Sequence, residues 1–333
     1  MKHAIKITLL LLGMFFITQL IGLFVISQYS PQISQVADEN GTITNVTSYN
    51  LPYGMDPPED VTPQGTLVSI VIAIAIAVFL MLTLMKFKAE TILRTWFFIV
   101  VTLALGITFN SLLLNFPYSP LIALIIALPI AIFKIFKRNI IVHNISELLI
   151  YPGIASIFVV LFNFTDKALS SGKYFGKLYE YFGLSASAWS IIAISAILIL
   201  ISLYDMYAVW HAGFMQKMAK YQIEKVKIFT GFFVPYLGQK ERDQLAKAKL
   251  SKNKNKKVKV SLAILGGGDV VFPLILAGVV FNHWGLLQAL IVSLFSTIAL
   301  AFLFYISEKG KFYPAMPFIT VGAFIGLAIA YLI

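Results

Sequence analysis

Two aspartates, Asp205 and Asp269, are the residues of this chain best suited to chemistry. Each lies in an apolar run long enough to cross a membrane, where a carboxyl group is costly and by default indicates a functional site. Two neighbouring carboxyl groups that share one proton can act as base and acid together, as the hydrolysis of an amide by water requires. The pair therefore predicts hydrolytic chemistry at a hydrated cavity between helices.

The residues around Asp269 differ from those of an ordinary spanning helix. Gly266, Gly267 and Gly268 precede it, and each glycine lowers helix stability by about 1 kcal/mol relative to alanine while letting another backbone approach. Pro273 has no amide hydrogen, so the carbonyl of Asp269, four residues earlier, loses its helical partner. Polar acceptors are thus left free beside an acid, which favours chemistry on a peptide backbone over helix packing.

The composition indicates an all-α polytopic membrane protein. Of the 333 residues, 59% are hydrophobic and 12% are charged, and the mean hydropathy is +0.85. A soluble domain could not bury so much apolar surface, and the chain repeats apolar runs of about 20 residues. The sequence has no cysteine, and its four histidines show no zinc-ligand spacing. We therefore predict neither a metal nor another cofactor.

Nine transmembrane helices are expected, and the basic residues give their orientation. Of the 26 lysines and arginines, 23 fall in loops on one side and 3 on the other. This split predicts that the N-terminus is inside and the C-terminus outside. It also explains the net charge of +11 without a nucleic-acid partner. The expected spans are 5–27, 66–86, 93–114, 118–136, 141–162, 187–210, 259–281, 284–305 and 313–332.

We divide the chain near residue 180. Residues 1–180 are predicted to form a scaffold of helices 1 to 5, with an irregular outer loop at 28–65 that contains five prolines. Residues 181–333 are predicted to hold catalytic helices 6 to 9 and a basic inner loop at 211–258. We expect a multi-pass protein of the cell membrane with this inner loop on the cytoplasmic side.

Three irregular points fall at one depth in this topology. Asp205 lies late in the sixth span, which runs from outside to inside. Asp269 lies about ten residues into the seventh span, or about 15 Å deep from the inner surface. Pro314 and Pro317 open the ninth span at its inner end, where they prevent an ordinary helix start. We expect these three points to form one site.

The ordered motifs carry a family resemblance. They are Tyr204-Asp205, then Gly266-Gly267-Gly268-Asp269, then Pro314-Ala315-Met316. In this order and on these helices, they resemble the presenilin and signal peptide peptidase family of intramembrane aspartyl proteases, most closely its archaeal presenilin homologues. One departure is Met316, where the family usually has a leucine of similar volume. The resemblance implies that Asp205 and Asp269 are catalytic, and that the substrate-binding residues include Tyr204, Gly266, Gly268, Pro314, Ala315 and Met316.

The resemblance also implies partners and leaves competing functions to weigh. Substrates would be transmembrane helices of membrane proteins, type I single-span proteins above all, or remnant signal peptides, cleaved within the lipid bilayer. No obligate partner subunit is inferred. An ion-coupled transporter also uses intramembrane carboxylates, but no clear inverted repeat is visible. A prepilin-type peptidase shares the Gly-x-Gly-Asp motif but has fewer spans and lacks the proline element.

Three more stretches have uncertain roles in the sequence. Residues 258–262 alternate apolar and polar side chains, and they either begin the seventh helix or form an edge strand whose Val260 and Leu262 bind an unwound substrate. The apolar segment 228–237 is too short to span; we expect it to restrict the cavity mouth, so that its deletion raises cleavage. The fifth span opens with His143, Asn144, Ser146 and Glu147. His143 and Glu147, four residues apart on one helix face, are either a polar pair near the inner membrane surface or a gate or contact to the acids.

Overall fold

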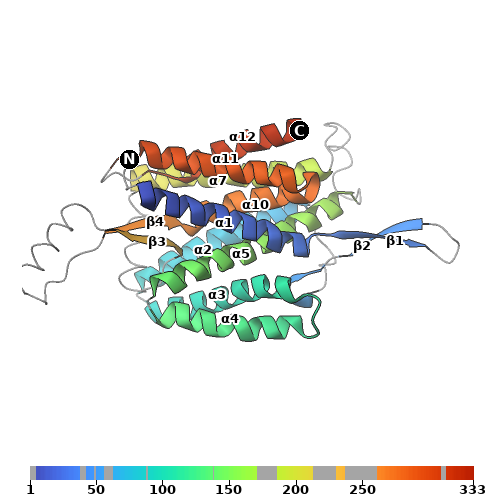
Figure 1. Ribbon diagram of the computed structural model, residues 1–333, viewed down its shortest axis with the longest axis horizontal. Helices are drawn as coiled ribbons and strands as arrows, with labels where there is room; N and C mark the ends of the chain where they lie inside the picture. Colours follow the sequence, from blue (N-terminus) through green and yellow to red (C-terminus); the bar gives the residue numbers. More distant parts are fainter. Residues whose placement is uncertain are drawn as a thin grey trace, which may run out of the picture.

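The computed structural model describes the chain outside residues 1–4, 38–42, 49, 56–62, 88, 138, 171–185, 213–229, 237–260 and 309–312. Its described part is a bundle of α-helices with two small antiparallel sheets (Figure 1). Most of the predicted basic loop at 211–258, and Val260, lie outside the described residues. The helices are α1 (Ile5–Tyr29), α2 (Pro63–Lys86), α3 (Glu90–Leu113), α4 (Ser119–Phe136), α5 (Ile140–Ser170), α7 (Ala186–Tyr207), α10 (Gly267–Trp284), α11 (Leu286–Ile306) and α12 (Met316–Leu332).

Each of these helices overlaps one of the predicted spans. Seven of them, counted among the described residues, contain segments long and apolar enough to cross a membrane. The apolar part of α2, Ala75–Leu84, and α12, Met316–Leu332, are shorter. The protein is therefore a polytopic α-helical membrane protein, as its composition predicts.

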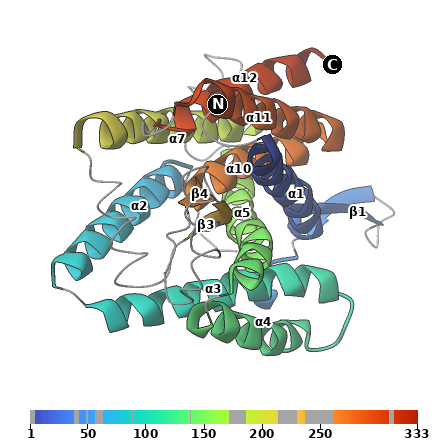
Figure 2. The same ribbon diagram turned by 60° about the vertical axis from the view of Figure 1, so that its left-hand side comes forward.

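The two ends of the bundle differ. Figure 1 shows the N-terminal end of the chain and strands β3 (Gly231–Tyr236) and β4 (Ser261–Gly266) at one end. The C-terminus and strands β1 (Gln32–Ala37) and β2 (Ile43–Ser48) lie at the opposite end. In Figure 2, α11 and α12 lie on one side of the bundle and α3 and α4 on the other, with α10 and α5 between them.

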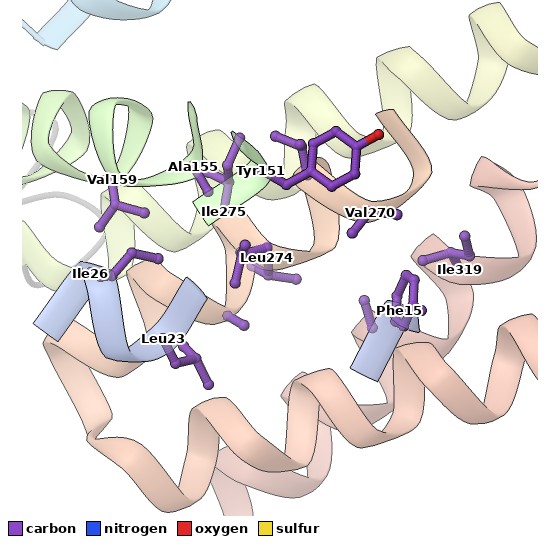
Figure 3. Packing of buried hydrophobic residues seen from close by; sticks show 14 of the residues in the cluster. Phe15, Leu23, Ile26, Tyr151, Ala155, Val159, Val270, Leu274, Ile275 and Ile319 are labelled. Atoms are coloured by element: carbon purple, nitrogen blue, oxygen red, sulfur yellow. The ribbon is translucent and has the colours of Figure 1, made fainter. Parts of the chain in front are cut away.

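Helix α10 is central because neighbouring helices pack closely around it. It contacts α1, α5, α7, α11 and α12. Leu274 of α10 is fully buried and lies against Gly22 of α1, while Gly278 contacts Ile26 of α1 and Val159 of α5 (Figure 3). The absence of a side chain at both glycines is what allows this approach. The core therefore joins residues from both sides of the predicted division near residue 180.

The loop predicted at 28–65 is more regular than expected. Strands β1 and β2 pair in antiparallel register from Gln32 opposite Ser48 to Ala37 opposite Ile43, and a short 3₁₀-helix follows at Pro52–Gly54. The prolines misled the prediction, since Pro31 and Pro52 lie outside both strands. The intervening sequence is rich in β-branched residues, which favour strands.

The prediction for the seventh span was wrong at its start. The helix begins at Gly267 rather than at 259, because Ser261–Gly266 forms β4 and pairs with β3. The three glycines disfavour helix across this junction, and β3 supplies the backbone partners that a helix would have supplied. Asp269 thus lies in the first turn of α10, so the estimated depth, which assumed helix from 259, does not hold.

The apolar segment 228–237 contains β3. Within it, Phe232 is fully buried and Val234 is 8% exposed, and both belong to the main core. The ring of Phe232 meets Tyr151 of α5 edge to face, with 5.5 Å between centroids. These residues are packed as core residues are, which argues against a removable plug.

Candidate active site

Asp205 lies in the last turn of α7 and is buried, with 5% of its surface exposed. Its Oδ2 accepts a hydrogen bond from the backbone amide of Met316, with 3.1 Å between the two atoms. The backbone amide of Ala315 also stabilises the charge of this carboxylate. The carboxyl group therefore joins α7 to the first residues of α12.

The start of α12 explains why an acid is needed there. The first amides of a helix have no carbonyl partner within that helix, and no side chain of the N-cap residue Ala315 satisfies them. Asp205 takes this capping role from a neighbouring helix. One turn away, the hydroxyl groups of Ser202 on α7 and Thr320 on α12 form a buried hydrogen bond of 2.8 Å. Two contacts thus fix α12 against α7.

Asp269 is the third residue of α10, and Gly266 is its N-cap. The carboxylate of Asp269 reaches back toward Gly266, whose backbone amide stabilises its charge, as the N-cap amide does for an acid at this position in a capping box. A β-carbon on Gly266 would lie 3.0 Å from Oδ2 of Asp269. A side chain at 266 would therefore crowd the carboxylate and require it to shift.

The other two glycines have different surroundings. A β-carbon on Gly267 would lie 2.8 Å from the hydroxyl of Tyr151, whereas one on Gly268 would meet only the ring of Phe272 at 3.7 Å or more. Gly267 is buried and Gly268 is exposed. Gly267 therefore serves helix packing against α5, while Gly268 leaves open backbone beside Asp269.

The two acids lie on adjacent helices, since α7 packs against both α10 and α12. They are close enough for the charge of Asp205 to act on Asp269. Asp269 is partly exposed, so a molecule outside the packed core can reach it. Gln19 of α1 donates from Nε2 to the carbonyl of Val270 at 3.0 Å and holds this end of α10 in place.

The hydrogen bonds between β3 and β4 determine which backbone groups of β4 face β3 and which face the outer edge of the strand. Gly267 donates to the carbonyl of Thr230 at 3.3 Å. In the observed register, the paired residues of β4 are therefore Leu265, Ala263 and Ser261. The amides and carbonyls of the alternate residues Leu262 and Ile264 face the outer edge. No described strand pairs with that edge.

Gly266 lies two residues after Ile264, so its amide faces the same outer edge of β4. The same amide stabilises the charge of the Asp269 carboxylate. The carboxylate of Asp269 consequently lies in line with the open edge of the strand. An extended peptide paired with that edge would run directly past the acid.

A known protein family matches the part of the chain that contains this arrangement. The family model described as "Signal-peptide peptidase, presenilin aspartyl protease" matches residues 178–333, which contain both acids and the proline motif. The C-terminal part of the chain, residues 178–333, therefore carries the protease region of the presenilin and signal peptide peptidase family. This protein is thus an intramembrane aspartic endopeptidase, and the alternative of an ion-coupled transporter is not supported.

The fold of this protease agrees with that family along nearly its whole length. It is similar to two structures of a presenilin family intramembrane aspartate protease, solved in space groups C222 and P2. The TM-scores are 0.56 and 0.53, at 17% sequence identity in both cases. The matches cover 98% of this chain and 98% and 97% of the other chains. A comparison with curated proteins found no match.

The predicted site residues of the protease do not all come together. Met316 and Ala315 lie beside Asp205. Gly266 lies beside Asp269. Pro314, the residue before Ala315, is buried. Tyr204 is 42% exposed, whereas its neighbour Asp205 is buried. Leu262 lies in β4 with its backbone at the outer edge.

Sequence reasoning missed two residues that shape the site of the protease. Tyr151 is buried and packs against Gly267 at the start of α10. It lies one turn beyond Glu147, so the spacing of polar residues along the fifth span was an available signal. Gln19 gave a second signal, because a glutamine in an apolar run of 25 residues needs a polar partner.

Proposed function

We propose that Asp205 and Asp269 are the catalytic dyad of this protease. The observation that carries the proposal is the convergence of three motifs, since Asp205 holds the start of α12 and acts electrostatically on Asp269 at the start of α10. Capping explains why each acid is tolerated, but it does not require two acids near each other in a membrane protein.

The dyad would hydrolyse an amide without a covalent intermediate. One carboxylate takes a proton from water, and the water oxygen bonds to the carbonyl carbon of the substrate. The other carboxyl group gives its proton to the carbonyl oxygen. Transfer of a proton to the amide nitrogen then allows the C–N bond to break, giving a carboxylic acid and an amine. The two acids act and titrate as one unit.

The substrate would be held as a strand along the outer edge of β4. A helical substrate shields its peptide bonds through internal hydrogen bonds, and unpaired amides or carbonyls in lipid cost several kcal/mol each. The backbone groups of Leu262 and Ile264 offer replacement partners in line with Asp269. Strand addition of this kind would stabilise the unwound segment and place one bond at the dyad. Val260, which lies outside the described residues, stays a predicted substrate-binding residue.

The remaining motif residues would line the substrate path. Gly268 leaves the backbone beside Asp269 accessible. Pro314 and Ala315 would present carbonyl groups on the side of the substrate opposite β4, and Tyr204 would contact the substrate or lipid from its exposed position. Residues 1–180 would act as a scaffold for the catalytic helices in 181–333, with which they share a core.

For the membrane topology, we propose nine crossings with the N-terminus in the cytoplasm and the C-terminus outside the cell membrane. The proposal is supported by the charge split and by the opposite positions of the two termini in Figure 1. The β3–β4 end would then face the cytoplasm, and type I single-span proteins are the favoured substrates. Labelling of Asn253→Cys in this cysteine-free chain tests the side. Ready labelling from outside by an impermeant reagent would reverse the orientation.

The dyad is tested by cleavage of a single-span substrate in reconstituted membranes. We expect Asp205→Asn and Asp269→Asn each to lose at least about 100-fold in rate, while Glu90→Gln, an acid at the start of α3, stays near native. Asparagine at 205 can still accept the amide of Met316, so the helices should stay in place. A near-native rate for either purified dyad variant would disprove the assignment.

A further inference from the structure

The carboxamide of Asn144, near the start of α5, pairs with the backbone of β3. Its Nδ2 donates to the carbonyl of Phe233 at 2.8 Å, and the amide of Phe233 donates to Oδ1 at 2.9 Å. Both groups belong to one residue of β3, and they face away from β4. A single side chain therefore makes the two hydrogen bonds that a neighbouring strand would make at this position.

The adjacent residue extends the same edge. Nε2 of His143 is hydrogen-bonded to the carbonyl of Gly231 at 2.8 Å, and its ring lies 4.9 Å from the ring of Phe233, centroid to centroid. Together, the side chains of His143 and Asn144 form hydrogen bonds with three backbone groups of β3, the carbonyl of Gly231 and the carbonyl and amide of Phe233. Helix α5 thus replaces a third strand on the side of β3 opposite β4.

A buried ion pair holds this end of α5. Nζ of Lys134 on α4 lies 2.6 Å from Oε1 of Glu147, and both side chains are almost completely buried. Oε1 of Glu147 is also 3.5 Å from Nε2 of His143. Ionic groups in a membrane helix are retained where they have a role. Here they fix the helix face that carries Asn144.

We propose that Asn144 is a positioning residue that sets which peptide bond of the substrate meets the dyad. The proposal rests on the proposed pairing of substrate with β4. Asn144 fixes β3 along the strand direction, β3 fixes β4 through the observed register, and the outer edge of β4 is aligned with Asp269. An isolated pair of strands is marginally stable, and strand register slips where it is weakly specified. The two bonds of Asn144 prevent that slip.

The test uses Asn144→Ala in the full-length protein, reconstituted in membranes with a single-span substrate. We expect about a tenfold loss in kcat, corresponding to the loss of two hydrogen bonds at one residue of the sheet, with a smaller change in KM. Mass spectrometry of the products should show cuts spread over neighbouring bonds, where the native protein favours fewer. Binding of a small transition-state mimic should change less than about threefold, because both acids remain in place.

Two further variants control for a structural effect. Ser146→Ala removes a buried hydroxyl on the same helix that donates to the carbonyl of Val142 in its own helix, and it should keep the native cut positions. Asn144→Asp keeps the acceptor for the Phe233 amide but loses the donor, so it should broaden the cuts less than alanine if the carboxyl group is tolerated. This second substitution also serves if the alanine variant does not fold.

The outcomes separate this inference from the proposed function. Native rate and native cut positions in folded Asn144→Ala would overturn the role of Asn144. A lower rate with unchanged cut positions and weaker mimic binding would also overturn it, since that result indicates a structural residue. An active Asp269→Asn would instead overturn the proposed dyad, whatever the behaviour of Asn144.

Discussion

The two small sheets of this protease have the same local structure but different surroundings. Strands β1 and β2 pair with each other and extend away from the helices (Figure 1). Strands β3 and β4 are built into the bundle, where Phe232 is fully buried and Leu265 is 3% exposed. Pairing alone gives a marginal element. Anchoring to helices gives β4 an edge with a defined position, which is what a substrate-binding strand requires.

The largest effect on cleavage is expected from deletion of β3, the anchored strand that pairs with β4. Loss of Gly231–Tyr236 removes the partner of β4 and a buried part of the core. We expect cleavage to be abolished, in contrast to the gain that a removable plug would give. Phe232→Ala should by itself lower the free energy of unfolding by about 3–5 kcal/mol. Pro235→Ala, at an exposed position of the strand, is the control, and thermal unfolding in detergent measures both.

A proline at Ile264 tests the open edge without removing the sheet. The Ile264 amide faces away from β3, and the side chain is 40% exposed, so proline is tolerated there as on an edge strand. We expect a loss of about 100-fold in cleavage of a transmembrane substrate, because the substrate loses one donor and leaves a carbonyl unpaired in a low dielectric. Binding of a small mimic should persist. Unimpaired proteolysis by the folded variant would exclude pairing at this residue.

The motif glycines provide a matched pair near the same edge. Gly266→Ala puts a β-carbon 3.0 Å from Oδ2 of Asp269, whereas Gly268→Ala makes only ordinary contacts. We expect about a tenfold loss in kcat for Gly266→Ala from displacement of the carboxylate. Gly268→Ala should leave thermal stability unchanged, and any rise in its KM then reports contact with substrate. Equal kinetics for the two variants would show that the space at Gly266 is not needed.

The smallest effect is expected at the other sheet. Replacing Gln32–Ser48 with a short glycine–serine linker removes β1 and β2 but leaves the core helices intact. We expect the cleavage rate in reconstituted membranes to stay within about threefold of native, since surface loops tolerate such changes. A large loss would mean that the outer sheet also guides substrate, and the contrast between the two sheets would fail.

Much of the fold follows from local features of the sequence. Apolar runs gave the helices to within a few residues in most cases, because a membrane helix satisfies its own backbone and needs only length and apolar composition. The start of α10 was missed because β4 depends on β3, and 24 residues separate Tyr236 from Ser261. A strand partner so far along the chain leaves no local signal at residues 259–266.

The sequence by itself determined the class of protein and indicated the acids and the motifs as candidates, since these depend on residue types and short spacings. Only the tertiary structure decided how they meet. The amide of Met316 reaches Asp205 across 111 positions of sequence, and Asn144 reaches Phe233 across 89. Hydrogen bonds between distant segments depend on where the packed helices place each backbone group. Composition and periodicity report which face of an element is apolar, but not which distant amide it will meet.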